Sequence, residues 1–156
     1  MPAPVHRVAA RVLPVSSTGE VLLLQCQDPA RQGDLHWISV GGAVDPGEPA
    51  ENAALRELAE ETGVVASADL LTDPLHRGDY PFSWAGVDYL SDTTFFALAL
   101  DRSTPVTFEG LEPAEVGNVL AAGWWTPDGL RADGTAASTD LPDIMDAAIA
   151  AVRGET

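Results

Sequence analysis

Three glutamates, Glu57, Glu60 and Glu61, are spaced so that a helix would gather their carboxylates on one face. Residues at positions i, i+3 and i+4 of an α-helix fall within an arc of about 100°. Ligand sets made of oxygen atoms alone suit hard divalent cations such as Mg²⁺ or Mn²⁺. The spacing therefore allows a metal site, whereas the alternative is the ordinary solvated face of an amphipathic helix.

The place of these glutamates along the helix argues against a merely solvated face. They fall in its last two turns, where the macrodipole is negative and disfavours each anion by about 0.3–1 kcal/mol. Glu57 and Glu61 also form a like-charge i, i+4 pair, and the neighbouring Arg56 can neutralise only one charge. A bound divalent cation would reverse the sign of these terms, and we therefore predict that the three side chains bind one.

The helix that carries them is predicted over residues 49–62. Pro49 suits the first helical position, and Gly63 can end the helix in the left-handed conformation. A turn at residues 45–48, with proline second and glycine third, leads into it. The expected core face lies opposite the glutamates and carries Leu55, Leu58, Ala59 and Thr62.

Strands are predicted on both sides of this helix. The expected strands are residues 5–15, 20–27, 37–40, 66–71, 86–89, 93–100 and 124–126. A closing helix is expected at residues 141–153, with Asp140 as its N-cap. This order predicts an α/β fold with a mixed sheet between helices. The length of 156 residues fits one domain, spanning residues 1–156.

The composition indicates which kinds of binding partner and which cellular compartment to expect for the protein. The 24 acidic residues outnumber 8 arginines, lysine is absent, and the formal net charge is −16, which argues against a nucleic-acid polymer as partner. An anionic small molecule would need a local positive field from a metal or from a few arginines. The single cysteine, Cys26, and the lack of an apolar run of membrane length predict a cytoplasmic protein with no membrane association.

A longer pattern surrounds the glutamates in residues 42–64, whose sequence is GAVDPGEPAENAALRELAEETGV. It fits G-x5-E-x7-R-E-U-x-E-E-x-G-U without a departure, where U is a bulky apolar residue. This pattern resembles the Nudix box, the signature of the Nudix hydrolases, which include the MutT-like pyrophosphohydrolases. The resemblance covers 23 of the 156 residues directly and implies the family's α/β/α sandwich, with a mixed β-sheet between helices, over most of the chain.

The resemblance also implies roles for individual residues of the box. The metal-binding residues would be Gly41, through its carbonyl, together with Glu57, Glu60 and Glu61, while Glu48 would support or extend the metal shell. Catalytic roles would fall on Arg56, which holds a catalytic glutamate in place, and on Glu57 and Glu60. The cofactor implied is Mg²⁺, with Mn²⁺ as a substitute.

The reaction implied by the resemblance is Mg²⁺-dependent hydrolysis of a pyrophosphate bond in a nucleoside diphosphate linked to another group. Nucleoside triphosphates, ADP-ribose and nucleotide sugars are the small-molecule substrates of this class. The sequence leaves open whether the protein forms a homodimer. Pro81 lies near a marker of ADP-ribose hydrolases and Tyr80 near one of dinucleoside-polyphosphate hydrolases, so the two markers compete. The alternative function is a nucleotide-sensing Nudix module that binds without turnover.

Residues outside the box would complete the site. Some Nudix hydrolases carry a general base on a loop before a tryptophan pair; here that loop offers Glu115 as the best match, with Glu109 and Glu112 as alternatives. The candidate phosphate contacts are Arg7, Arg11 and Arg77. The aromatic side chains that could stack a base are Trp37, Phe82, Trp84, Tyr89, Trp124 and Trp125. For each of them the alternative is a role in packing or at the surface.

Overall fold

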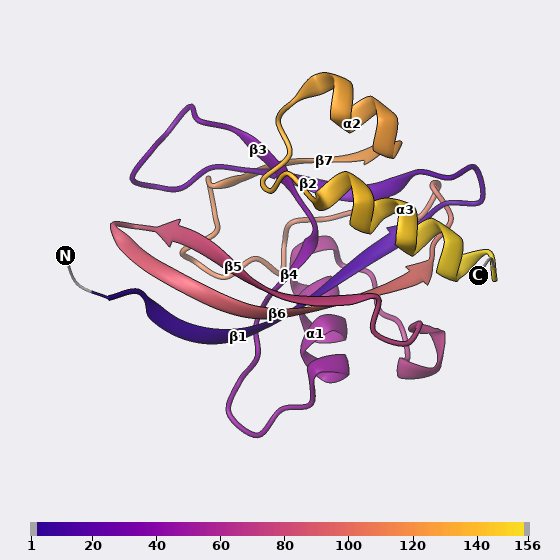
Figure 1. The fold of residues 1–156 in the computed structure, drawn as a ribbon, viewed down its shortest axis with the longest axis horizontal. Helices are drawn as coiled ribbons and strands as arrows, with labels where there is room; N and C mark the ends of the chain where they lie inside the picture. Colours follow the sequence, from indigo (N-terminus) through magenta and orange to yellow (C-terminus); the bar gives the residue numbers. More distant parts are fainter. Residues whose placement is uncertain (1–2, 155–156) are drawn as a thin grey trace.

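A curled, mixed β-sheet of seven strands forms the centre of the fold (Figure 1). The computed structural model describes residues 3–154. The main path of the sheet is β3 (His36–Ile38), β2 (Val21–Cys26), β1 (Val5–Val15), β6 (Val87–Ala99) and β5 (His76–Trp84). Two strands lie off this path: β4 (Val40–Ala43) pairs with β1 and β7 (Val119–Trp125) pairs with β2. Strands β1 and β6 run parallel along eleven paired residues, and the other pairs are antiparallel.

Helices cover both faces of the sheet, and each face has its own hydrophobic core. Helix α1 (Ala50–Thr62) lies on one side, and α3 (Leu141–Val152) lies on the other with the short α2 (Pro127–Asp133) beside it (Figure 1). Strand β1 contributes to both cores because its side chains alternate between the two faces. Val12 packs in the core under α1, whereas Leu13 packs in the core under α3. The predicted α/β sandwich with a mixed sheet is confirmed.

The ends of helix α1 differ from their prediction only in detail. Pro49 is extended, with φ −63° and ψ 147°, and is the N-cap and not the first helical residue. Gly63 has a φ of +78° and its N–H donates to the Ala59 carbonyl, so a glycine ends the helix as predicted. Of the four predicted core residues, Leu58 and Thr62 are fully buried, whereas Leu55 and Ala59 are half-buried.

Several predicted strands were wrong in extent or kind. Residues 66–71 contain a short 3₁₀ helix, η1 (Ala68–Leu70), and residues 37–40 are divided between β3 and β4. The two strands predicted at 86–89 and 93–100 form the single strand β6, which leaves out residues 86 and 100, and β7 ends at Trp125, one residue before the predicted end. The prediction missed β5 and α2. β5 contains Pro81, but it is the edge strand of the sheet, where a proline removes no ladder hydrogen bond that the sheet needs.

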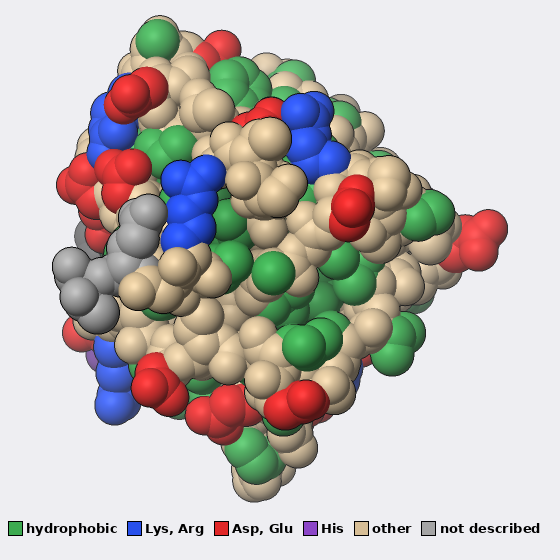
Figure 2. Space-filling model, turned by 90° about the vertical axis from the view of Figure 1, so that its right-hand side faces the viewer, with side chains coloured by type: hydrophobic (Ala, Val, Ile, Leu, Met, Phe, Trp, Pro, Cys, Tyr) green, Lys and Arg blue, Asp and Glu red, His purple; other side chains and the backbone are tan. Residues whose placement is uncertain are grey.

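Much of the positive charge is neutralised at the surface. Arg77, Arg102 and Arg131 form ion pairs with carboxylates, and Arg131 alone contacts three aspartates. On the face in Figure 2, the basic side chains stand apart among acidic and apolar ones. Within residues 3–154, no helix combines the length and apolar character that crossing a membrane requires.

Candidate active site

Two glycines of β4 allow close packing against this strand, Gly42 toward α1 and Gly41 toward β1. A Cβ atom on Gly42 would lie 2.6 Å from the Glu57 Oε1 atom, and one on Gly41 would lie 2.4 Å from the Ala10 carbonyl oxygen. Real side chains do not tolerate such distances. The Gly41 N–H donates a hydrogen bond of 2.7 Å to Glu61 Oε1. Gly42 therefore leaves room for the Glu57 carboxylate between the helix and the sheet, and the Gly41 amide binds the carboxylate of Glu61.

The expectation that all three glutamates face away from the core was wrong. Glu57 and Glu61 are only 8% and 5% exposed, and Glu60 is half-buried. Ala53 and Ala54 are fully buried on the same side of α1. Their small side chains let this side of the helix pack inward, and the glycines of β4 then receive the longer glutamates.

Burial changes the protonation of these two carboxylates. Desolvation, with a smaller contribution from the charge of Glu60, raises the pKa of Glu57 to about 7. Desolvation and the charge of Glu57 raise the pKa of Glu61 well above its usual range. The positive charges of Arg56 and Arg11 oppose these shifts without cancelling them. Ionising both glutamates is therefore unfavourable until a further positive charge arrives.

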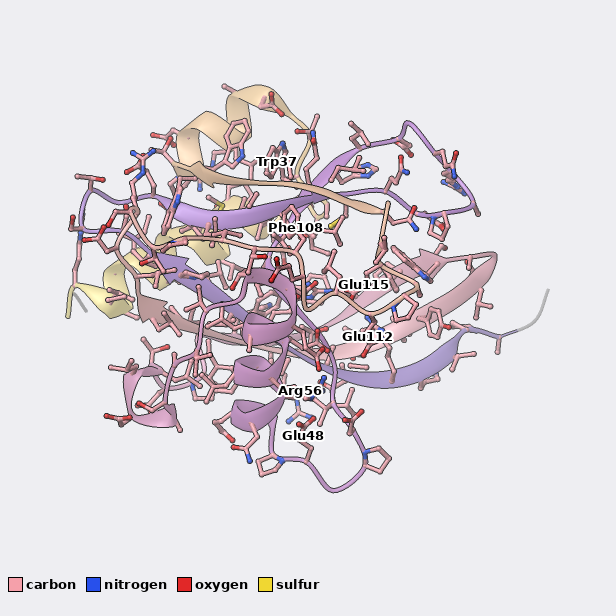
Figure 3. The ribbon with its side chains drawn as sticks, turned by 180° about the vertical axis from the view of Figure 1, so that it is seen from behind. Trp37, Glu48, Arg56, Phe108, Glu112 and Glu115 are labelled. Atoms are coloured by element: carbon pink, nitrogen blue, oxygen red, sulfur yellow. The ribbon has the colours of Figure 1, made fainter. Side chains whose placement is uncertain are left out.

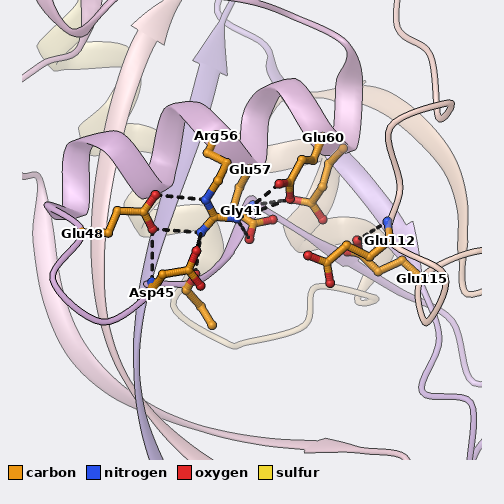
Figure 4. Close-up of polar contacts among 10 residues, drawn as sticks. Gly41, Asp45, Glu48, Arg56, Glu57, Glu60, Glu112 and Glu115 are labelled. Atoms are coloured by element: carbon orange, nitrogen blue, oxygen red, sulfur yellow. Dashed lines mark hydrogen bonds and ion pairs between the residues drawn. The ribbon is translucent and has the colours of Figure 1, made fainter.

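Arg56 links the helix to the loop before it (Figure 4). Its Nε and Nη2 atoms each donate a 3.0 Å hydrogen bond to the Glu48 carboxylate, and Nη2 also donates to the Ala43 carbonyl at 3.0 Å. Its Nη1 atom lies 3.1 Å from Glu57 Oε1 and 3.4 Å from the oxygens of Glu60. Glu48 thus fixes Arg56, and Arg56 in turn orients Glu57. The geometry favours a supporting role for Glu48 over direct membership of a metal shell.

A loop before β7 brings further carboxylates to the opposite side of the site. Its start is fixed to the end of α1, because the Thr107 N–H donates to the Thr62 carbonyl at 2.9 Å. Farther along, Glu115 Oε1 accepts a 3.2 Å hydrogen bond from the Glu112 N–H. Figure 4 shows both side chains across from Glu57 and Glu60. Glu112 and Glu115 line the same cleft as Glu57 and Glu61, whereas Glu109 is exposed on the loop outside that lining.

This first cleft has a volume of about 340 Å³ and two chemically different ends. The carboxylates of α1 and of the loop form one end. At the other end the Arg7 guanidinium lies 4.8 Å from the centre of the Phe82 ring and 5.5 Å from that of Tyr89. Trp84 stacks beside Phe82 at 6.0 Å between ring centres. The cleft therefore offers an acidic end and an aromatic, cationic end.

The acidic end of the cleft has the carboxylate oxygens that a metal site requires, although hydrogen bonds hold these carboxylates to other groups of the protein. Among residues 3–154, no three carboxylate, imidazole or thiol groups converge closely enough to hold a metal ion. Glu57 accepts a hydrogen bond from Arg56, and Glu61 accepts one from the Gly41 N–H. The donors are nonetheless all oxygens, two of the carboxylates are buried, and Glu60 adjoins them on the helix. This set fits a hard divalent cation.

Comparison with known proteins identifies the family. A family model described as the NUDIX domain matches residues 5–143. The chain belongs to the NUDIX family. A MutT protein from Methanosarcina mazei Go1 has the same fold, with a TM-score of 0.69, 16% sequence identity and 94% of each chain covered. The Nudix residues 42–64 thus form the end of β4, the following loop, the whole of α1, its cap Gly63 and the residue after the cap.

Curated relatives match this Nudix chain over part of their length. An uncharacterized Nudix hydrolase, orf19 of Rhodococcus erythropolis, is 35% identical over 103 residues, which is 64% of this chain and 51% of the relative. The bis(5'-nucleosyl)-tetraphosphatase of Mus musculus is 52% identical over 62 residues, 40% of each protein. The chain therefore matches about half or less of the length of these two relatives.

The structure brings together most, but not all, of the residues that were predicted outside the Nudix box. Arg7, Phe82 and Glu115 line the first cleft. Trp37 lies away from the labelled acidic residues (Figure 3), edge-on to Trp125 with ring centres 5.4 Å apart. Arg77 is 70% exposed and paired with Asp92 at 2.6 Å, on the opposite face of β5 from Phe82.

Among the side chains that line the first cleft, Trp84 and Tyr89 were candidates for stacking a base, and Glu112 was an alternative to Glu115. Sequence reasoning missed Cys26, because its place on the apolar strand β2 does not indicate that it lines a cleft. Burial raises the pKa of Cys26 to about 12, so its thiol is neutral at physiological pH.

Proposed function

We propose that this Nudix chain is a hydrolase that cleaves the pyrophosphate bond of a nucleoside diphosphate linked to another group. One observation carries the proposal: a single cleft joins the box carboxylates Glu57 and Glu61 to the aromatic and cationic group around Arg7 and Phe82. The acidic end would hold a divalent cation, Mg²⁺ or Mn²⁺. The aromatic end would stack a nucleobase, since rings and a guanidinium offer flat faces to it.

Each box residue then has a role that its contacts support. Glu57, Glu60 and Glu61, with the Gly41 carbonyl, would hold the cation, which when bound would neutralise phosphate charge and lower the pKa of a bound water. The Arg56 guanidinium contacts Glu57 at 3.1 Å and Glu60 at 3.4 Å, so it orients Glu57 and keeps the two carboxylates apart. The half-buried guanidinium of Arg11 donates to the Ser39 carbonyl at 2.7 Å and lines the same cleft, where it would contact a phosphate.

Glu115 is the proposed general base that takes a proton from the attacking water. We expect Glu115→Gln to lower kcat by about 10²-fold, the lower end of the usual range for general-base catalysis. Glu109→Gln is the matched control, because it removes the same charge from the same loop at an exposed position outside the cleft. Steady-state kinetics and thermal unfolding of both variants check the prediction. Equal losses of kcat in the two variants would reject Glu115 as the base.

An activity screen tests the proposed function. The protein is incubated with Mg²⁺ and nucleoside triphosphates, ADP-ribose, nucleotide sugars or dinucleoside polyphosphates, and released nucleotides are separated by chromatography. We expect turnover of at least one substrate that stops when the cation is chelated. Binding of these nucleotides without any turnover would instead support the sensing module.

A further inference from the structure

The backbone around Glu115 is held by hydrogen bonds on both sides of that residue. Glu112 and Glu115 lie on the loop that precedes β7 (Figure 3). The Glu115 N–H donates to the Glu112 carbonyl at 2.9 Å. The Glu115 carbonyl accepts from the Asn118 N–H at 2.9 Å and from the Val119 N–H at 3.0 Å. Two successive turns therefore determine where the half-buried Glu115 side chain lies in the lining of the first cleft.

The side chain of Asn118 adds a further contact to this backbone. Its Nδ2 atom donates to the Ala114 carbonyl at 3.2 Å. The Ala114 carbonyl and the Glu115 N–H belong to one planar peptide unit. Because the N–H of that unit is already bonded to Glu112, both of its polar atoms are held. The peptide unit cannot rotate without breaking a hydrogen bond, and its orientation sets the direction in which the Glu115 side chain leaves the backbone.

Gln27 determines which end of the Asn118 amide faces Ala114. The Gly33 N–H donates to Gln27 Oε1 at 2.9 Å, so the Gln27 Nε2 atom is the end that remains for other partners. That atom lies 3.4 Å from Asn118 Oδ1 and 3.3 Å from the Gly117 carbonyl oxygen, and both of these oxygens can only accept. Asn118 therefore turns its oxygen toward Gln27 and its amide N–H groups toward Ala114.

These contacts connect the loop to the central sheet. Gln27 directly follows Cys26, the last residue of β2, and its N–H donates to the Asn118 carbonyl at 2.9 Å. This bond continues the pairing of β2 with β7, in which Cys26 lies opposite Val119. Gln27 also lines a second cleft, of about 270 Å³, that shares a wall with the first. Asn118 is not one of the described residues that line either cleft, so it is placed to act on Glu115 and not on a substrate.

We propose that Asn118 is a positioning residue, whose amide holds the peptide unit before Glu115 and so keeps the Glu115 carboxylate within reach of the attacking water. The inference rests on the proposed function and names a residue that supports its general base. A general base acts only within hydrogen-bond distance of the proton that it accepts. A small displacement of a reacting group lowers the rate of a reaction even when every chemical group is present.

The test removes the amide donor of Asn118 in two ways. Asn118→Asp keeps the size of the side chain and can still accept from Gln27, but a carboxylate has no N–H to donate to Ala114. Asn118→Ala removes the side chain without adding a charge. With Mg²⁺ and the fastest substrate among nucleoside triphosphates, ADP-ribose, nucleotide sugars and dinucleoside polyphosphates, we expect kcat to fall about tenfold in both variants, the scale of one hydrogen bond. KM should stay close to that of the wild type.

A second experiment distinguishes a positioning role from a merely structural one. Asn118→Ala is combined with Glu115→Gln, and kcat and Tm are measured for the single and double variants. If Asn118 acts through Glu115, its removal should cost little further activity once the carboxylate is gone, whereas independent effects would multiply. Asn52→Ala is the matched control, because Asn52 is the other asparagine of the chain and is exposed on α1 outside both clefts. It should leave kcat unchanged.

Different failures separate this inference from the proposed function. Wild-type kcat in both Asn118 variants, or the same loss from Asn118→Ala with and without Glu115→Gln, would overturn the positioning role while the hydrolase stands. Full activity of Glu115→Gln would reject the base and its positioning residue together, and the hydrolase would use another base. The lack of turnover by the wild type with every substrate would reject the hydrolase and this role with it. If Asn118→Ala does not fold, the same comparisons are made with Asn118→Asp.

Discussion

Glu61→Gln is expected to lower kcat/KM by about two orders of magnitude or more, comparable to the loss of a main electrostatic group in other active sites. Glutamine has the shape of glutamate and can still accept the hydrogen bond from the Gly41 N–H, so the packing of α1 should persist. It cannot supply the negative charge that a divalent cation requires. We expect similar losses in Glu57→Gln and Glu60→Gln, measured by steady-state kinetics over a range of Mg²⁺ concentrations.

Glu51→Gln provides the control for charge on the same helix. Glu51 is exposed in the first turn of α1, away from the cleft lining. Its replacement should leave turnover close to wild type. Without metal, Glu61→Gln should also be more stable than wild type, because it removes the cost of a buried carboxylate charge. A fully active Glu61→Gln enzyme would contradict the proposed metal site.

Mg²⁺ is expected to stabilise the folded protein strongly at neutral pH and weakly at pH 5. A ligand that binds only the native state at a hundredfold excess over its Kd adds about 2.7 kcal/mol to the free energy of unfolding. At about 2–4 °C per kcal/mol for a domain of this size, the Tm should rise by about 5–10 °C. Thermal unfolding monitored by circular dichroism, with and without Mg²⁺, measures this shift.

The pH dependence follows from the raised pKa of Glu57, from 4.5 to about 7. Below pH 4.5 the side chain is protonated in both states, and its burial carries no charge penalty. As the pH rises from 4.5 to about 7, the unfolded chain releases a proton that the folded chain retains, so the free energy of unfolding falls. Glu61 acts in the same direction. Mg²⁺ binds the ionised forms, and its stabilisation therefore grows over this interval.

Two controls separate this linkage from general charge screening. NaCl at matched ionic strength should give a smaller rise in Tm, because it screens all 24 acidic residues without binding at the site. In the double variant Glu57→Gln/Glu61→Gln the Mg²⁺-specific rise should vanish. A rise of equal size with NaCl, or one that persists in the double variant, would place any bound cation elsewhere.

The sequence predicted best what depends on local pattern. The spacing of Glu57, Glu60 and Glu61, together with Gly63, was enough to predict α1 and its end. The extents of β1 and β2 followed from apolar runs bounded by turns. Local rules of helix periodicity and turn chemistry determine such elements, and the full Nudix pattern then predicted the family that the match to residues 5–143 confirms.

What could not be predicted depends on packing between distant segments. The burial of Glu57 became visible only once β4 lay against α1, with Gly42 opposite the carboxylate. Strand β5 does alternate, with half-buried Tyr80, Phe82 and Trp84 between exposed residues, but Gly78 and Pro81 within it are typical of turns and concealed the strand. The placing of Trp37 against Trp125 likewise arises from the pairing of β2 with both β3 and β7.

Because β1 packs in both cores and also carries Arg7 and Arg11, this strand has little freedom to change in evolution. A substitution that altered either arginine would act next to residues on which folding depends. The segment 27–36 and the turn between β5 and β6 are at the surface and contribute little to either core. Substitutions in those two surface segments should therefore disturb folding less than substitutions in β1, which packs in both cores.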